Sequence, residues 1–129
     1  MPGRANSAFT VDKQDAQPAE GWKGGKMNRT RFAKTFTGDL AGTSVVEAIM
    51  VGLDDGGPMI YVGVERFDCT LAGRKGTFVL LHSATAHGGN QNGSWTIVSG
   101  SGTGELAGIT GTGEILPNHA FVLNYELPN

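Results

Sequence analysis

The sequence predicts an all-β protein, folded as a closed or nearly closed antiparallel barrel of about eight strands. Runs of β-branched and aromatic residues alternate with turn sequences along the chain, and no stretch of helical length has a 3.6-residue period. The 129 residues include 21 glycines and only five prolines, a composition that suits tight turns and closely spaced strands. Consecutive antiparallel strands leave unpaired edges, and closure into a barrel removes them.

The first quarter of the chain predicts one short strand and a loop. Residues 8–11 (AFTV) favour a strand, and residues 15–26 contain Pro18 and three glycines around Trp22. A tryptophan in a polar loop most often covers the end of a hydrophobic core, because its ring buries a large area. We therefore expect Trp22 to close one end of the barrel; the alternative is a platform for a ligand.

From residue 29 the pattern is regular and predicts seven further strands. Their ranges are 31–37, 44–53, 59–70, 75–83, 95–99, 111–116 and 119–127. Residues 45–52 (VVEAIMVG) could pass for a helix, but their Val and Ile content favours a strand.

The tripeptide Leu-Ala-Gly occurs three times, at residues 40–42, 71–73 and 106–108. Each copy lies between two predicted strands, and glycine supplies the positive φ of a two-residue turn. Each copy therefore predicts the tip of a β-hairpin, with its leucine packed over the open end of the sheet. Residues 54–58 (DDGGP) predict a turn, and residues 87–93 (HGGNQNG) a polar loop.

Composition and charge point to one soluble domain. The formal charge is −2 and no basic stripe is present, so nucleic acid is not an expected partner. Cys69 is the only cysteine, which excludes an internal disulfide and suits a reducing compartment. No N-terminal apolar segment or run of 18 apolar residues indicates a leader or a membrane span, and we expect a cytoplasmic protein.

Several predicted strands are apolar on both faces. Within residues 44–53, for example, Ile49 and Val51 lie on one face, and Val46 and Ala48 on the other. One face can line the barrel, and the other then needs a cover. A second copy of the chain is the simplest cover, so we expect a homo-oligomer, either a dimer or a trimer.

The second hairpin brings a carboxylate and an imidazole together. If Ala72 and Gly73 form a two-residue loop, Gly63 lies opposite His82, and Glu65 becomes a diagonal neighbour of His82 on one face. Such a pair between apolar walls can transfer a proton or anchor a ligand. The alternative is a structural ion pair, or a histidine hydrogen-bonded to a strand carbonyl.

The same register in the first hairpin sets Glu47 opposite Phe36. If that face is interior, Glu47 is a buried carboxylate with a raised pKa and a candidate site residue. If that face is exterior, Glu47 can pair with a basic residue such as Lys34. Both alternatives stay open.

Other site chemistries lack their sequence patterns, so neither a metal nor a cofactor is expected. The glycines at 100, 102 and 104 lack the third glycine and the helix of a dinucleotide site. His82, His87, His119 and Cys69 lack the ligand spacing of a zinc site. The serines of the chain lack a Gly-x-Ser-x-Gly context.

Four segments resemble the bacterial DUF3224 family. They are residues 36–43 (FTGDLAGT), 61–67 (YVGVERF), 73–82 (GRKGTFVLLH) and 95–111 (WTIVSGSGTGELAGITG). The resemblance covers about residues 36–126 and implies an eight-stranded barrel similar to that of allene oxide cyclase, without an assigned function. It does not carry the cyclase chemistry with it. Cys69 departs from the family pattern, which tends to have glycine there.

A barrel of this size can hold one small molecule, so the leading hypothesis is a small apolar or amphipathic ligand in its mouth. Glu65 and His82 would orient the ligand. Further ligand-binding candidates are Glu47, Tyr61, Phe67, Phe78, Leu80, Trp95 and Tyr125. The alternatives are an isomerase or cyclase that moves a proton with the same pair, and a structural oligomer whose barrel is filled by side chains.

Overall fold

The computed structural model describes residues 2–88 and 90–128, which form nine strands and one short 3-10 helix. The strands are β1 (Pro2–Ala16), β2 (Glu20–Trp22), β3 (Gly25–Gly38), β4 (Leu40–Leu53), β5 (Met59–Leu71), β6 (Arg74–His87), β7 (Asn90–Ile97), β8 (Thr110–Leu116) and β9 (Ala120–Glu126). The helix η1 (Gly104–Leu106) lies between β7 and β8.

Eight of these strands close into an antiparallel barrel. The sheet order runs from β1 through β9, β8, β7, β6, β5 and β4 to β3, and a further pairing between β3 and β1 completes the circle. The three-residue β2 adds to β3 outside this circle. The predicted fold class, an all-β antiparallel eight-stranded barrel, is confirmed, and residues 45–52 lie within the strand β4.

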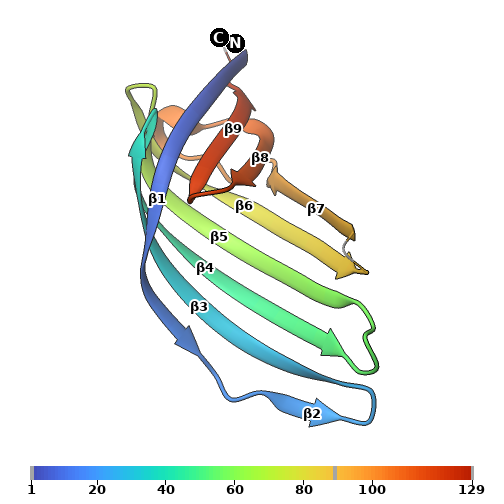
Figure 1. The fold of residues 1–129 in the computed structure, drawn as a ribbon. Coiled ribbons are helices and arrows are strands. Elements are labelled where there is room, and N and C mark those ends of the chain that lie inside the picture. The colour runs from blue at the N-terminus through green and yellow to red at the C-terminus, as the bar shows by residue number, and fades with distance from the viewer. Residues whose placement is uncertain (1, 89, 129) are drawn as a thin grey trace.

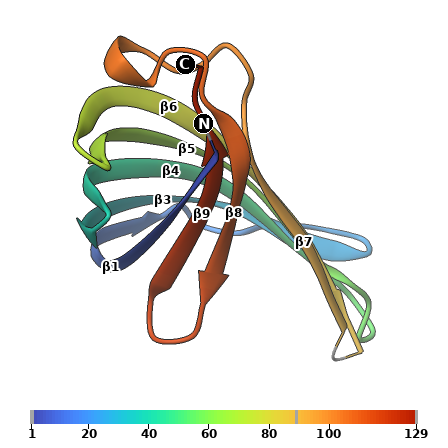
Figure 2. The ribbon, with the colours of Figure 1, turned by 90° about the horizontal axis from the view of Figure 1, so that it is seen from above.

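The two ends of the barrel differ in shape. Strands β3 to β6 have 13 or 14 residues, whereas β8 and β9 have seven each. The long strands therefore continue past the short ones as an open, flared sheet (Figure 1). Viewed from above, β8 and β9 stand across one part of this sheet (Figure 2). We call the two parts the closed end and the flared end.

Side chains fill the closed end. Phe36 contacts Phe9, Phe67 and Phe121, with ring centroids 5.1 to 5.6 Å apart, and Phe67 stacks on Phe78 at 4.7 Å. The buried aliphatic residues around these rings include Leu40, Leu71, Leu80, Leu106, Ile109 and Leu123. This cluster is the hydrophobic core, and dense packing of this kind leaves few voids.

The N-terminal prediction is wrong in three respects. The first strand has 15 residues instead of four, because β1 pairs with β9 on one side and with β3 on the other. The region expected to be a loop contains β2 and the start of β3. Trp22 is 48% exposed and does not cover the core.

Only one of the three Leu-Ala-Gly copies forms the predicted hairpin tip. Ala72 and Gly73 make the turn between β5 and β6, with φ values of 49° and 83°. Residues 40–42 instead begin β4, and residues 106–108 start at the last residue of η1 and continue into the connection to β8. The three leucines nevertheless all pack into the core, and each is fully buried. A loop was also expected over residues 87–93, but His87 ends β6 and residues 90–93 belong to β7, while residue 89 lies outside the described residues.

Within the described residues, no helix has the length and apolar character needed to cross a membrane.

Candidate functional site

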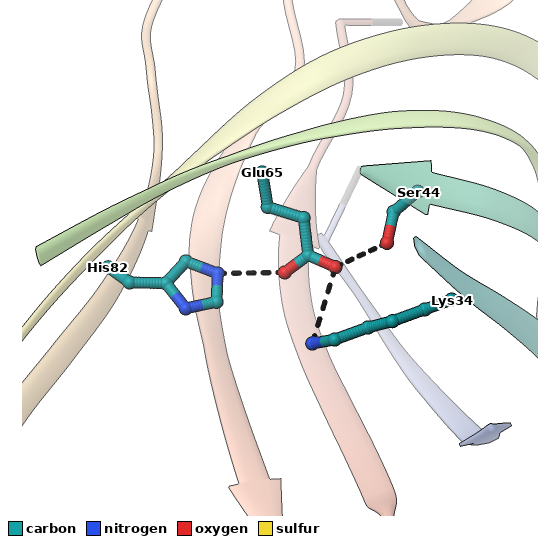
Figure 3. Close-up of polar contacts among 4 residues, drawn as sticks. All are labelled: Lys34, Ser44, Glu65 and His82. Carbon is teal, nitrogen blue, oxygen red and sulfur yellow. Dashed lines mark hydrogen bonds and ion pairs between the residues drawn. The ribbon is translucent and has the colours of Figure 1, made fainter. Parts of the chain in front are cut away.

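Four polar side chains from neighbouring strands meet inside the barrel. They come from β3, β4, β5 and β6, and we call them the charged layer: Lys34, Ser44, Glu65 and His82 (Figure 3). Side chains alternate between the two faces of a strand, so these residues share the inner face with Phe36, Phe67 and Leu80. The charged layer therefore lies next to the phenylalanines of the closed end.

Glu65 is the centre of the charged layer. Its Oε1 lies 2.8 Å from Nε2 of His82. Its Oε2 accepts a hydrogen bond of 2.5 Å from the Ser44 hydroxyl and lies 3.6 Å from the Lys34 ammonium. Glu65 and His82 are both 1% exposed. A buried carboxylate is stable only when it is paired and hydrogen-bonded, and here both oxygens have partners.

These partners determine the protonation of the carboxyl group. Burial raises the pKa of Glu65, but the hydrogen bond from His82, the charge of Lys34 and the hydrogen bond from Ser44 together outweigh it. The pKa of Glu65 therefore lies below its ordinary value of 4.5. Because the carboxylate is ionised at neutral pH, Nε2 of His82 must carry the proton that they share.

Among the described residues, the other ring nitrogen of His82 has no hydrogen-bond partner. Nδ1 of His82 and Nε1 of Trp95 are both buried, and neither has a hydrogen-bond partner among the described residues. The two rings are in contact edge to face, with centroids 5.9 Å apart. Tyr61 lies on another side of His82, with ring centroids 6.0 Å apart. Two unpartnered polar nitrogens in one place are unusual, because each loses its hydration without compensation.

A pocket of about 600 Å³ opens at the flared end, next to these rings. We call it the mouth pocket. Its apolar lining on the inner face is Met50, Met59, Tyr61, Ala84, Ala86 and Trp95. Tyr61 and Trp95 thus have two roles, because each lines the pocket and each also packs against His82. The pocket is separated from the charged layer by these two rings.

Glycines make room for both rings. A Cβ atom at Gly63 would lie 3.0 Å from the Tyr61 hydroxyl, and one at Gly93 would lie 2.8 Å from the ring of Trp95. Each aromatic side chain therefore lies flat over a glycine two residues away on its own strand. Burial and, to a smaller extent, the charge of Glu65 raise the pKa of Tyr61 to about 12, so its hydroxyl stays protonated at neutral pH.

The register predicted for the second hairpin is confirmed. Leu71 pairs with Arg74, Phe67 with Phe78, Glu65 with Leu80 and Gly63 with His82. The expected proximity of Glu65 and His82 follows from this register. Among the further ligand-binding candidates, Tyr61 and Trp95 line the mouth pocket.

Other candidate residues lie elsewhere. Phe67, Phe78 and Leu80 are buried within the core of the closed end, where they contact other side chains. Tyr125 packs against that core from β9, with its ring over Gly3. The structure thus places these four residues outside the mouth pocket.

Glu47 lies on the outer face of the barrel. The predicted register of the first hairpin is wrong, because Glu47 pairs with Arg31 and not with Phe36. Its carboxylate lies 3.2 Å from the Arg31 guanidinium, and both side chains are more than half exposed. The exterior alternative therefore holds, with Arg31 as the partner in place of Lys34.

Lys34 and Ser44 are the site residues that the sequence prediction missed. Lys34 is buried, forms the ion pair with Glu65 and lies 4.7 Å from the centroid of the Phe9 ring. A signal was present in the sequence: Phe32, Lys34 and Phe36 alternate along one strand and so share a face. A lysine between two phenylalanines on a core-facing side requires an acidic partner.

Among the residues that the structure describes, no group of three or more His, Cys, Asp or Glu side chains could hold a metal ion. Cys69 is buried, and burial together with the charge of Asp68 raises the pKa of its thiol to about 12. The thiol is therefore protonated at neutral pH and is a poor nucleophile.

Comparison with known proteins agrees with this architecture. The sequence model of a family described as "Protein of unknown function (DUF3224)" matches residues 5–128. A crystal structure of a DUF3224 family protein of unknown function from Shewanella oneidensis MR-1 is similar, with a TM-score of 0.84 and 30% sequence identity. The alignment covers 97% of this chain and 95% of that one. No curated protein matches the sequence. The chain belongs to the DUF3224 family.

Proposed function

We propose that the protein binds a small apolar or amphipathic molecule in the mouth pocket. One observation carries the proposal: the two rings that line this pocket, Tyr61 and Trp95, pack directly on the buried pair of His82 and Glu65. Ligand sites in proteins typically combine a mostly apolar wall with a few fixed polar groups. The mouth pocket has the apolar wall, and the fixed polar groups, Glu65 and His82, lie directly behind two of its rings.

At the closed end, phenylalanine and leucine side chains occupy the interior. Other hollows exist on the surface, including one of about 320 Å³ beside Arg66 and Asp68. Among the described residues, however, the only buried side-chain nitrogens without partners are those of His82 and Trp95. The filled interior of the closed end and the two unpartnered nitrogens behind the wall of the mouth pocket favour this pocket over the other hollows.

The experiment is a fluorescence titration with N-phenyl-1-naphthylamine, a neutral apolar probe. The wild-type protein should bind it with one site per chain. The variant Ala84→Trp places a large ring in the pocket and should abolish binding. Thr70→Trp is the matched control, because Thr70 is exposed on the outer face of β5 and its variant should bind normally. Equal binding by both variants would contradict the proposal, as would a wild-type protein that binds nothing.

Proton transfer is a second candidate function, and the unpartnered Nδ1 of His82 favours it. With Nε2 held by Glu65, a neutral imidazole presents the lone pair of Nδ1 as a base. A suitable probe is 2-tetralone in deuterated water. Nδ1 would take an α proton, the electron pair would form the enolate, and a deuteron would return to the carbon.

Under this second candidate, the wild-type protein should accelerate deuterium uptake into 2-tetralone and His82→Gln should not. Nuclear magnetic resonance measures both rates. If the two proteins and buffer alone give the same rate, the site is a binding site only.

For the outer face we propose a second copy of the chain as partner. Four apolar side chains on β4, β5 and β6 are 41 to 43% exposed and adjacent in the sheet: Ile49, Val62, Val64 and Leu81. A contiguous apolar face of this kind is typical of a subunit interface. Size-exclusion chromatography with light scattering should give a dimer or trimer at micromolar concentration, and Val64→Lys should give monomers. A monomeric wild-type protein would overturn this proposal.

A further inference from the structure

The two unpartnered nitrogens specify which polar group the ligand carries. The indole Nε1–H of Trp95 can only donate a hydrogen bond, so it requires an acceptor. His82 donates from Nε2 to the ionised Glu65, so Nδ1 of a neutral imidazole can only accept and requires a donor. A hydroxyl group satisfies both requirements with one oxygen atom, because it donates one hydrogen bond and accepts others.

We propose that the ligand is an apolar molecule with a neutral hydroxyl group, such as an alcohol, a phenol or an enol. Its O–H donates to Nδ1 of His82, and its oxygen accepts from Nε1–H of Trp95. This inference rests on the proposed function, since it names the ligand class of the same pocket. It requires Tyr61 or Trp95 to turn aside, because their rings stand between the mouth pocket and His82.

The charges of the site support a neutral head group over an anion. Lys34 already balances the charge of Glu65, so the charged layer carries no net charge when the imidazole is neutral. An anionic head would bring a second negative charge close to the buried Glu65 carboxylate. It would bind only if His82 also took up a proton. A hydroxyl requires no such change, because it enters without charge.

Three probes of one shape separate these possibilities by isothermal titration calorimetry at neutral pH. They are 2-naphthol, which has an O–H; 2-methoxynaphthalene, which accepts but does not donate; and 2-naphthoate, which is an anion. We expect 2-naphthol to bind about tenfold more tightly than 2-methoxynaphthalene, the effect of one hydrogen bond to an otherwise unpartnered buried group. We expect 2-naphthoate to bind most weakly.

The variant His82→Gln tests the role of Nδ1. A glutamine amide can still donate to Glu65 from the position of Nε2, but it has no atom in the position of Nδ1. It should reduce the affinity for 2-naphthol to that for 2-methoxynaphthalene and leave the latter almost unchanged. If this variant does not fold, the three affinities of the wild-type protein still decide the question.

Each outcome has one meaning. Equal wild-type affinities for 2-naphthol and 2-methoxynaphthalene would overturn the hydroxyl inference and leave apolar binding intact. Tightest binding of 2-naphthoate would also overturn it, and would indicate a site for an acid with a protonated His82. If none of the three probes binds, the proposed function itself fails, and this inference fails with it.

Discussion

The two ends of the barrel interior use the same strands for different purposes. At the closed end, β5 and β6 contribute Phe67 and Phe78, which stack in a core of mainly aromatic and aliphatic side chains. A few residues further along the same strands, they contribute Glu65 and His82, beside positions occupied by glycine and alanine. The closed end buries apolar area and stabilises the fold. Toward the flared end lie instead the charged layer, the mouth pocket and two buried nitrogens that have no partner among the described residues.

This difference shows how a small barrel can maintain a buried charged site that by itself opposes folding. Burying Glu65 and Lys34 opposes folding unless their mutual contacts compensate for the lost hydration. The phenylalanine core lies directly beside the charged layer and holds the four strands that carry it. Stability supplied by one end therefore allows polar groups to be buried at the other.

Truncation of the core should have the largest effect. Phe67→Ala removes a ring that contacts Phe36, Phe78 and Phe121. The free energy of unfolding should fall by about 3–5 kcal/mol, from lost burial and the cavity left behind. Urea denaturation measures it, and Phe67→Leu should lose less. A loss below about 1 kcal/mol for Phe67→Ala would mean that the closed end is not tightly packed.

Neutralising the buried carboxylate should have the next largest effect. Glu65→Gln leaves the Lys34 ammonium buried without its counter-charge, although the amide can still bond to Ser44. We expect a loss of about 2–3 kcal/mol in the free energy of unfolding. The control is Glu47→Gln, the same change on the exposed outer face, which should cost less than about 1 kcal/mol. Equal losses would remove the distinction between the two carboxylates.

The stability should depend on pH through Glu65. Its pKa is lowered in the folded protein, so below about pH 4.5 the unfolded chain takes up a proton that the folded chain does not. The free energy of unfolding contributed by Glu65 is therefore fully present above about pH 4.5 and is lost as the pH falls below it. The difference in unfolding free energy between wild type and Glu65→Gln should shrink from pH 7 to about pH 3.5. A difference independent of pH would show that the contacts of Glu65 do not favour its charge.

The smallest effect concerns Tyr61, at the boundary between pocket and charged layer. One tyrosine should ionise at a pH of about 12, because burial and the charge of Glu65 raise the pKa of Tyr61. Since the folded pKa is the higher one, any contribution to stability is lost only as the pH rises above about 10. Ultraviolet absorbance follows the titration, and Tyr61→Phe should remove this step without changing stability at neutral pH. Persistence of the step in that variant would place it on another residue.

The sequence was sufficient for the second hairpin because local rules determine it. Ala72 and Gly73 take the positive φ values that a two-residue turn requires, and every pairing from Leu71 to Gly63 follows from that turn. The proximity of Glu65 and His82 was predictable for the same reason.

The first hairpin was not predictable from local rules, because a distant strand determines its turn. The chain reverses at Gly38 and Asp39, before the Leu-Ala-Gly sequence. The amide of Asn6 donates to the Asp39 carboxylate, and the amide of Leu40 donates to the Ser7 hydroxyl. These contacts with β1 select the turn and shift the register, which places Lys34 and Ser44 beside Glu65 and sends Glu47 outside.

The third Leu-Ala-Gly copy differs for a related reason. The segment before it lies along β6, where side-chain oxygens of Ser101, Thr103 and Glu105 accept hydrogen bonds from backbone amides of Val79, Thr77 and Lys75. A connection that binds the edge of a strand in this way cannot also form a two-residue hairpin. No local pattern in the sequence reveals such a partner.

The indole N–H signals in a ¹H–¹⁵N correlation spectrum provide the most direct test of the central claim, that the flared end binds the ligand. The chain has two tryptophans, Trp95 in the wall of the mouth pocket and the exposed Trp22 on β2, and Trp95→Phe assigns their signals. On addition of 2-naphthol, the Trp95 signal should shift and saturate while the Trp22 signal stays in place. A Trp95 signal that does not move at saturating 2-naphthol, or a shift confined to Trp22, would contradict the account.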